Sequence, residues 1–193
     1  MDSSLYQWIN DLQGRTGWAH GPMAFYADWG IVLFAGLLLA AFLVARSRGD
    51  LLGVAGAVWA GGAAVVALGI AQVVNAIVDR PRPYVTLADV HVLISRTTDS
   101  TFPSDHSTAV GAVAVGLWFV NRRIGMVAVV AALFMAFTRV YVGVHYPLDV
   151  LAGLALGGGV AAAGHRWVVP HLHRLAERIA TTRTGWLVTA PAT

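Results

Sequence analysis

The stretch LLGVAGAVWAGGAAVVALGIAQVVNAIV, residues 51–78, indicates a transmembrane helix, because Gln72 and Asn75 are its only strongly polar side chains. A helix of about 20 mostly apolar residues is long enough to cross the hydrocarbon core of a bilayer. Hydrophobic residues make up 57% of the 193-residue chain and charged residues only 12%, whereas a soluble domain carries about 25% charged residues. This composition excludes a soluble globular protein and indicates a membrane protein.

Further mainly apolar runs lie on both sides of that stretch, at residues 23–45, 107–120, 124–144 and 150–164. We expect five spans, an amphipathic segment near residues 3–14 and a polar helical tail from about residue 171 to 180. Gly153 and Gly157 are four residues apart, a spacing that lets helix backbones approach closely in lipid. The sequence therefore predicts an all-α integral membrane helical bundle of about five or six transmembrane helices, in a single membrane-embedded domain over residues 1–193.

Arginine supplies every basic residue of the chain, which contains no lysine. One set of span ends carries Arg46, Arg48, Arg122, Arg123, Arg166, Arg174, Arg178 and Arg183. The opposite set carries Arg15, Arg80, Arg82, Arg96 and Arg139. Because basic residues are enriched in cytoplasmic loops, the larger group should lie in the cytoplasm and the smaller group outside. This topology also explains the basic composition without a nucleic-acid partner.

Three separated stretches with reactive side chains reach the outer face in this topology: residues 75–83, 102–106 and 138–149. Guanidinium groups gathered at one place match the oxygens of a phosphate. The helix that begins after Pro103 adds free backbone N–H groups, which also bind anions. Arg139 lies inside an otherwise apolar span, where a charge is costly and is by default functional. The three stretches therefore predict one anion-binding site.

Two histidines supply acid–base chemistry at this site. His145 and Asp149 are four residues apart, which lets the carboxylate orient the imidazole and stabilise its cationic form. His106 supplies a general acid. With the arginines, these residues predict phosphoryl transfer through a phosphohistidine that needs no metal and no cofactor. A histidine–metal site is the alternative, but the nearby carboxylates of Asp105 and Asp149 must share their space with arginines.

These motifs also resemble a known family. The order Arg82-Pro83, then Pro103-Ser104-Asp105-His106, then Thr138-Arg139 followed by His145 and Asp149, is similar to the tripartite signature of the type 2 phosphatidic acid phosphatase superfamily. Within it, residues 100–106, 121–125 and 142–151 resemble the bacitracin-resistance type of undecaprenyl-diphosphatase. The resemblance implies a helical acid-phosphatase/haloperoxidase-like core.

The roles of the site residues follow from this resemblance. His145 resembles the nucleophile and Asp149 its orienting partner, while His106 resembles the acid that protonates the leaving oxygen and then activates water. Arg82, Ser104 and Arg139 resemble the phosphate ligands. The implied reaction removes the terminal phosphate of an isoprenoid lipid diphosphate, leaving undecaprenyl phosphate, the recycled carrier of cell-wall synthesis. The implied location is the bacterial plasma membrane, with a multi-pass chain and the site on the extracytoplasmic side.

Two positions depart from the family pattern. The first motif usually opens with a lysine seven residues before the arginine, where this chain has Asn75. Arg80 is a candidate replacement for that charge, and Asn75, Arg80 and Asp105 are all candidate substrate-binding residues. Asp105 stands where many members have glycine, and the resemblance associates it with the diphosphatase subgroup. The structural alternatives are that Ser104 or Asp105 only caps its helix and that Arg80 only anchors a loop at the membrane interface.

Other functions stay open beside the diphosphatase. One is a phosphatase of phosphatidylglycerol phosphate, phosphatidate or another lipid phosphate. Another is a non-catalytic lipid-binding or lipid-translocating protein, which only the asparagine at position 75 favours. A channel would distribute polar residues through its spans, whereas here they concentrate at one face. The sequence does not indicate an oligomeric state.

Overall fold

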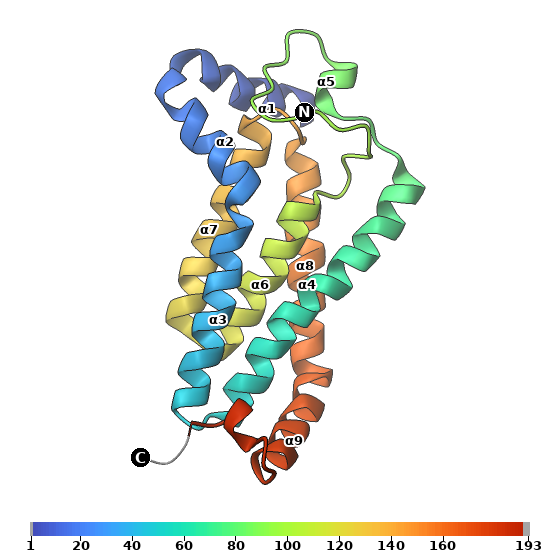
Figure 1. Cartoon of the computed structure of the whole chain (residues 1–193). Coiled ribbons are helices and arrows are strands. Elements are labelled where there is room, and N and C mark those ends of the chain that lie inside the picture. Colours follow the sequence, from blue (N-terminus) through green and yellow to red (C-terminus); the bar gives the residue numbers. More distant parts are fainter. Residues whose placement is uncertain (1, 191–193) are drawn as a thin grey trace.

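The computed structural model describes residues 2–190, and these residues form an all-helical bundle (Figure 1). Its helices are α1 (Asp2–Asn10), α2 (His20–Trp29), α3 (Ile31–Ser47), α4 (Leu51–Val78), α5 (Pro83–Thr86), α6 (Asp105–Val120), α7 (Arg122–Tyr141), α8 (Pro147–Trp167) and α9 (Val169–Ala180), with short 3-10 helices at Asp11–Arg15, Gly17–Ala19 and Gly185–Leu187. Residues 1 and 191–193 of the expected domain lie outside the described part.

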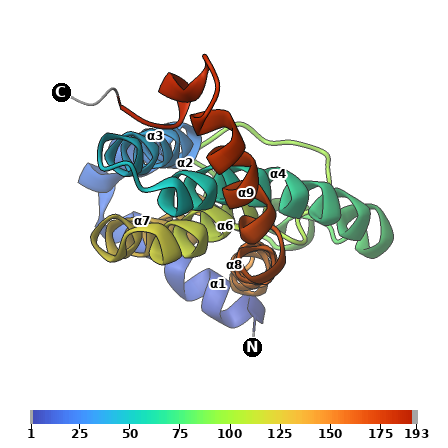
Figure 2. The same cartoon turned by 90° about the horizontal axis from the view of Figure 1, so that it is seen from below.

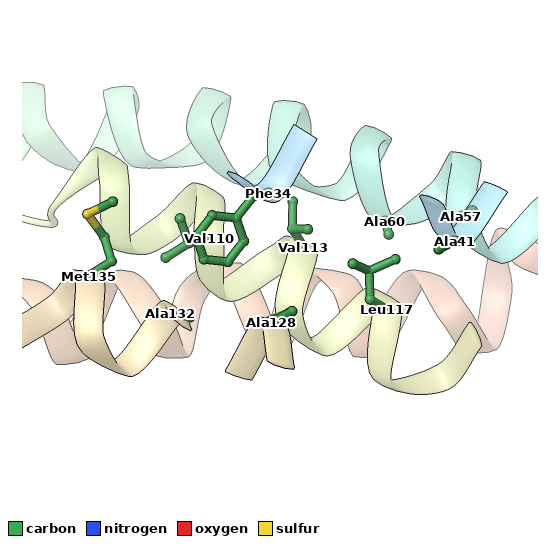
Figure 3. Close-up of a cluster of buried hydrophobic side chains, with 11 residues drawn as sticks. Phe34, Ala41, Ala57, Ala60, Val110, Val113, Leu117, Ala128, Ala132 and Met135 are labelled. Atoms are coloured by element: carbon green, nitrogen blue, oxygen red, sulfur yellow. The ribbon is translucent and has the colours of Figure 1, made fainter. Parts of the chain in front are cut away.

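Helix α6 occupies the centre of the bundle, and α3, α4, α7 and α8 surround it when the molecule is viewed from below (Figure 2). Its buried face presents Val110, Val113 and Leu117 to the neighbouring helices. The partners of these side chains are Phe34, Ala41, Ala57, Ala60, Ala128, Ala132 and Met135, from α3, α4 and α7 (Figure 3). Because lipid tails are as apolar as these side chains, close van der Waals packing rather than escape from water stabilises this core.

The helices that are long and apolar enough to cross a membrane number three among the described residues: α4, α7 and α8. The segments Gly17–Trp29 and Ile31–Ser47 count as a fourth span if the pair, bent by 54°, crosses as one unit. This number is lower than the five or six expected from the apolar runs. Helix α6 has 16 residues, or about 24 Å of helix, which is shorter than the roughly 30 Å of hydrocarbon.

The bend between α2 and α3 lies at Gly30, inside the run expected to form one span. A Cβ atom at Gly30 would stand 2.5 Å from the carbonyl oxygen of Tyr26 and 2.6 Å from the terminal methyl group of Met135. Glycine therefore lets the bent segment lie directly against α7.

The contact between α6 and α8 depends on glycines, as the spacing of Gly153 and Gly157 predicted. A Cβ atom at Gly157 would stand 2.0 Å from the carbonyl oxygen of Thr108 and 2.7 Å from the backbone nitrogen of Ala112. At Gly153 it would stand 2.7 Å from the carbonyl oxygen of Ser104. These clashes are with backbone atoms, so the two helices can approach this closely only without side chains at both positions.

Gly157→Ala should therefore lower the free energy of unfolding by about 1–3 kcal/mol, the usual cost of overpacking a core. Gly159→Ala is the matched control, because a Cβ atom at this position of the same helix has nothing within 4 Å. Thermal unfolding of both variants in one detergent compares them. Equal midpoints would show that α6 and α8 do not depend on this contact.

The two ends of the bundle differ in character. The lower end in Figure 1 carries the arginines that end α3 and α8, begin α7 and belong to α9. Helix α9 packs across this end, where Ala176 joins a cluster with Ala45, Val54 and Val188. The upper end carries α1, α5 and the long connection from α5 to α6. All three stretches with reactive side chains reach this upper end.

Candidate active site

A cavity of about 190 Å³ lies at the upper end of the bundle. Its lining comes from the loop before α5, the connection to α6, the first turn of α6, the last turn of α7 and the loop after it. The residues are Arg82, Ser95, Thr97, Asp99, Ser100, Pro103, Asp105, His106, Arg139, Val144 and His145. Five of the nine residues proposed from the sequence line this cavity directly.

His145 lies in the tight loop between α7 and α8 and is 3% exposed. Gly143 shapes that loop: its φ is +90°, and a Cβ atom there would stand 2.2 Å from the carbonyl oxygen of His91. The Nδ1 atom of His145 lies 3.0 Å from the carbonyl oxygen of Thr101. Because a carbonyl oxygen only accepts hydrogen bonds, this contact places the proton on Nδ1 and leaves Nε2 unprotonated.

Burial lowers the pKa of His145 to about 4, and the positive charges of Arg139 and Arg82 act in the same direction against the raising effect of Asp149. The imidazole is therefore neutral near pH 7. A neutral imidazole with a free Nε2 lone pair has the form that a nucleophile requires.

Asp149 is fully buried behind His145, at the start of α8. Its Oδ2 atom lies 3.9 Å from Nδ1 of His145, too far for the direct hydrogen bond that the sequence spacing predicted. Thr101 fills the gap. Its hydroxyl lies 2.9 Å from Nδ1 of His145 and donates a 2.8 Å hydrogen bond to Oδ2 of Asp149. The carboxylate thus reaches the imidazole through a buried threonine, which the sequence did not single out.

Two arginines bring positive charge to the cavity. Arg139 is 6% exposed and donates from Nη1 to the carbonyl oxygen of Ala27 at 3.2 Å, while its buried Nε has no partner within the described residues. Arg82 donates from Nη1 to the carbonyl oxygen of Val144 at 3.1 Å. The Nη2 atom of Arg82 meets both oxygens of Asp99 at 3.1 and 3.2 Å. The carboxylate of Asp99 therefore occupies one side of the Arg82 guanidinium, a group whose geometry matches that of a phosphate.

Asp99 belongs to the connection between α5 and α6, and its side chain is largely exposed. Partial burial raises the pKa of Asp99, but a hydrogen bond with Thr97 and the charge of Arg82 outweigh this effect and hold the pKa below its usual value. The carboxylate is therefore ionised beside Arg82. Nothing in the sequence distinguished it from other loop aspartates.

Asp105 and Asn75, the two departures from the family pattern, contact each other. The Nδ2 atom of Asn75 lies 3.5 Å from Oδ1 of Asp105, and Gln72 donates to Oδ2 at 3.0 Å. Two amide side chains of α4 thus hold the carboxylate at the edge of the cavity. Asn75 itself does not line the cavity, and its buried Oδ1 has no partner among the described residues.

Ser104 immediately precedes α6 and is completely buried. Its backbone N–H donates to the carbonyl oxygen of Asp149 at 3.1 Å, which ties the start of α6 to the start of α8. The hydroxyl has no hydrogen-bond partner within residues 2–190. It makes no cap hydrogen bond to its own helix, so the alternative of a purely capping serine finds no support.

Arg80 lies elsewhere than predicted. Its guanidinium faces two carboxylates, with Nη1 at 2.5 Å from Oδ1 of Asp149 and Nη2 at 2.6 Å from Oδ2 of Asp2. It is absent from the cavity lining. The structure therefore does not bring Arg80 into the cavity with Arg82 and Arg139, because ion pairs on both terminal nitrogens hold it beside Asp149 and Asp2.

Known proteins resemble this chain in both sequence and fold. The chain is 34% identical over 158 residues to undecaprenyl-diphosphatase BcrC of Bacillus subtilis, covering 81% of this chain and 78% of the relative. It is 30% identical over 172 residues to a protein of Bacillus licheniformis named bacitracin transport permease protein BcrC, covering 89% and 82%.

Two solved structures share the fold. The crystal structure of Aquifex aeolicus LpxE has a TM-score of 0.65 at 24% identity, covering 85% of this chain and 94% of that one. A transmembrane PAP2 type phosphatidylglycerolphosphate phosphatase from Bacillus subtilis has a TM-score of 0.58 at 21% identity, covering 94% and 87%. The family model of the PAP2 superfamily matches residues 56–172, which include all three motif stretches and more than half of the chain. The chain is therefore a membrane protein that belongs to the PAP2 superfamily.

Proposed function

We propose that this chain is a metal-independent lipid phosphatase that hydrolyses undecaprenyl diphosphate, or a similar polyprenyl diphosphate, to the monophosphate and inorganic phosphate. One observation carries the proposal. A buried neutral imidazole, His145, with its proton fixed on Nδ1, lines the same cavity as Arg82, Arg139 and a second histidine, His106. This combination provides a nucleophile, charge for a phosphoryl group and an acid–base group.

The reaction has two steps. In the first, Nε2 of His145 attacks the terminal phosphorus, and the bond from that phosphorus to the bridging oxygen breaks. His106, in its protonated imidazolium form, gives its proton to the leaving polyprenyl phosphate and becomes neutral. In the second, His106 takes a proton from water, which attacks the phosphohistidine and releases inorganic phosphate. His145 returns to its neutral form.

The positive charge for both steps comes from the protein. The guanidinium groups of Arg82 and Arg139 bind the oxygens of the transferring phosphoryl group, on which negative charge is concentrated. The hydroxyl of Ser104, which has no hydrogen-bond partner within residues 2–190, adds a donor. An arriving phosphate displaces the carboxylate of Asp99 from Arg82 or shares the guanidinium with it.

Similarity to a named undecaprenyl-diphosphatase over most of the chain supports a diphosphate substrate. The similar proteins also include a phosphatidylglycerolphosphate phosphatase and a lipid A 1-phosphatase. Phosphatidylglycerol phosphate and phosphatidate therefore stay the competing substrates considered from the sequence. The arginine-rich lower end of the bundle supports a cytoplasmic location for that end. The cavity then opens to the extracytoplasmic side of a bacterial plasma membrane.

Purified protein in detergent with EDTA should release phosphate from undecaprenyl diphosphate at least about 10-fold faster, by kcat/KM, than from phosphatidate or phosphatidylglycerol phosphate. The reason is that a phosphate monoester leaves more readily than an alkoxide, so cleavage depends less on the leaving-group acid. Preference for either of the other lipids would support the phosphatase activity but contradict the assignment of undecaprenyl diphosphate as the substrate. No release from any of the three, with the lipids still bound, would favour the lipid-binding or translocating alternative.

A further inference from the structure

The first residues of α1 lie close to the catalytic loop, although about 145 positions separate them in the sequence. Oδ1 of Asp2 accepts a 3.0 Å hydrogen bond from the backbone N–H of Leu148, in the first turn of α8. Oδ2 of Asp2 meets Nη2 of Arg80 at 2.6 Å. The side chain of Asp2 thus joins a free helix-terminal N–H group to the guanidinium that holds Asp149.

Further contacts fix α1 in this place. Tyr6 is completely buried, and its hydroxyl donates to the carbonyl oxygen of Gly143 at 3.1 Å. Its ring centroid lies 5.4 Å from that of Tyr146. Asn10 donates to the carbonyl oxygen of Tyr141 at 3.2 Å in a buried setting. Helix α1 is therefore packed and hydrogen-bonded against the loop that carries His145.

Arg80 has further contacts through its ring-facing guanidinium and its backbone. Its guanidinium carbon lies 4.1 Å from the centroid of the Tyr146 ring, a stacking that suits the planar guanidinium. Its backbone N–H donates to Oγ of Ser100 at 3.1 Å, and its carbonyl oxygen accepts from the N–H of Thr101 at 2.9 Å. The residue thus fixes both Asp149 and the segment that contains the bridging threonine.

We propose that Arg80 is a positioning residue that holds Asp149 in line with Thr101 and His145, and that Asp2 of α1 holds Arg80 in turn. Oδ2 of Asp149 accepts from Thr101 and from the N–H of Tyr146, both at 2.8 Å. Oδ1 accepts from Arg80. A carboxylate with donors on both oxygens cannot rotate away from the threonine. This inference rests on the phosphatase activity proposed above.

Arg80→Gln should lower kcat by about 10- to 100-fold, as loss of an orienting partner does. It should leave the inhibition constants of inorganic phosphate and vanadate unchanged within about twofold, because Arg80 does not line the cavity. Arg82→Gln is the contrast, since a cavity arginine should weaken both inhibitors. Arg15→Gln is the control for charge, because it removes an exposed arginine at the same end of the bundle.

The dependence on α1 is tested by Asp2→Asn, with Asp11→Asn as its control. Asp2→Asn should lower kcat by about 3- to 10-fold in the wild-type background. It should have little further effect in the Arg80→Gln background, because the two side chains act in one chain of contacts. Arg80→Lys, which can pair with one carboxylate, should restore part of kcat.

Three results would overturn the inference: a weaker phosphate or vanadate inhibition in Arg80→Gln, a kcat equal to wild type, or additive effects of Asp2→Asn and Arg80→Gln. If Arg80→Gln does not fold, Arg80→Lys and Asp2→Asn test the inference instead. Each should lower kcat and leave the inhibition constants of phosphate and vanadate unchanged. A wild-type protein that releases no phosphate from any lipid would instead contradict the proposed function itself.

Discussion

His145→Ala should lower phosphate release from undecaprenyl diphosphate by at least about 10⁴-fold, the scale seen when a catalytic nucleophile is removed. The loss should appear in kcat, because Arg82 and Arg139 still bind the substrate. Among the described residues that line the cavity, only His145 is a buried, neutral imidazole with its proton fixed on Nδ1 and its Nε2 free to attack. The measurement is phosphate release under single-turnover and steady-state conditions.

His91→Ala is the control for this variant, because His91 lies in the same upper part of the molecule, is exposed and does not line the cavity. It should keep nearly full activity. Residual turnover of His145→Ala within tenfold of wild type would exclude His145 as the nucleophile.

Thr101→Val should lower kcat by about 100-fold, or about 2.7 kcal/mol of transition-state stabilisation, with little change in KM. Valine nearly preserves the shape of threonine, so the buried position stays filled. The hydroxyl that joins Asp149 to the imidazole is lost, while the backbone carbonyl at position 101 still holds Nδ1. The carboxylate then stands 3.9 Å from Nδ1 of His145 without a bridge.

Thr101→Ser separates the hydroxyl from packing, since serine keeps the hydroxyl and loses only a methyl group. It should retain at least about a third of the wild-type kcat. Equal losses in the serine and valine variants would mean that Thr101 contributes packing rather than a connection between Asp149 and His145.

The helices were readable from the sequence because a bilayer demands long apolar runs, and α4 matches its predicted run of residues 51–78. The break at Gly30 was not readable. Whether a glycine bends a helix depends on what packs against it. Here that neighbour is Met135 of α7, which is far from Gly30 in the sequence. Helix α6, which the apolar run of residues 107–120 predicts as a span, has 16 residues and is shorter than α4, α7 and α8.

The sequence predicts a site residue where a charged side chain stands in an apolar span, because burying a charge there costs free energy. Arg139 is the example. One residue, Pro81, separates Arg80 from Arg82. Sequence spacing alone cannot show that the guanidinium of Arg80 points to Asp149. Thr101 carries no charge, so nothing in a loop sequence marks it as a bridge. Asp2 lies too far along the chain from α8 for any local pattern to connect them.

A phosphohistidine at position 145 is tested by a rapid alkali quench of His106→Ala mixed with undecaprenyl diphosphate labelled in its terminal phosphate. The phosphate-monoester leaving group departs with little help from an acid, whereas hydrolysis of the intermediate needs a base to activate water. We therefore expect label to accumulate on the protein, to be stable to alkali and labile to acid, and to map to His145. Inorganic phosphate released with no protein-bound label, or label on another residue, would contradict it.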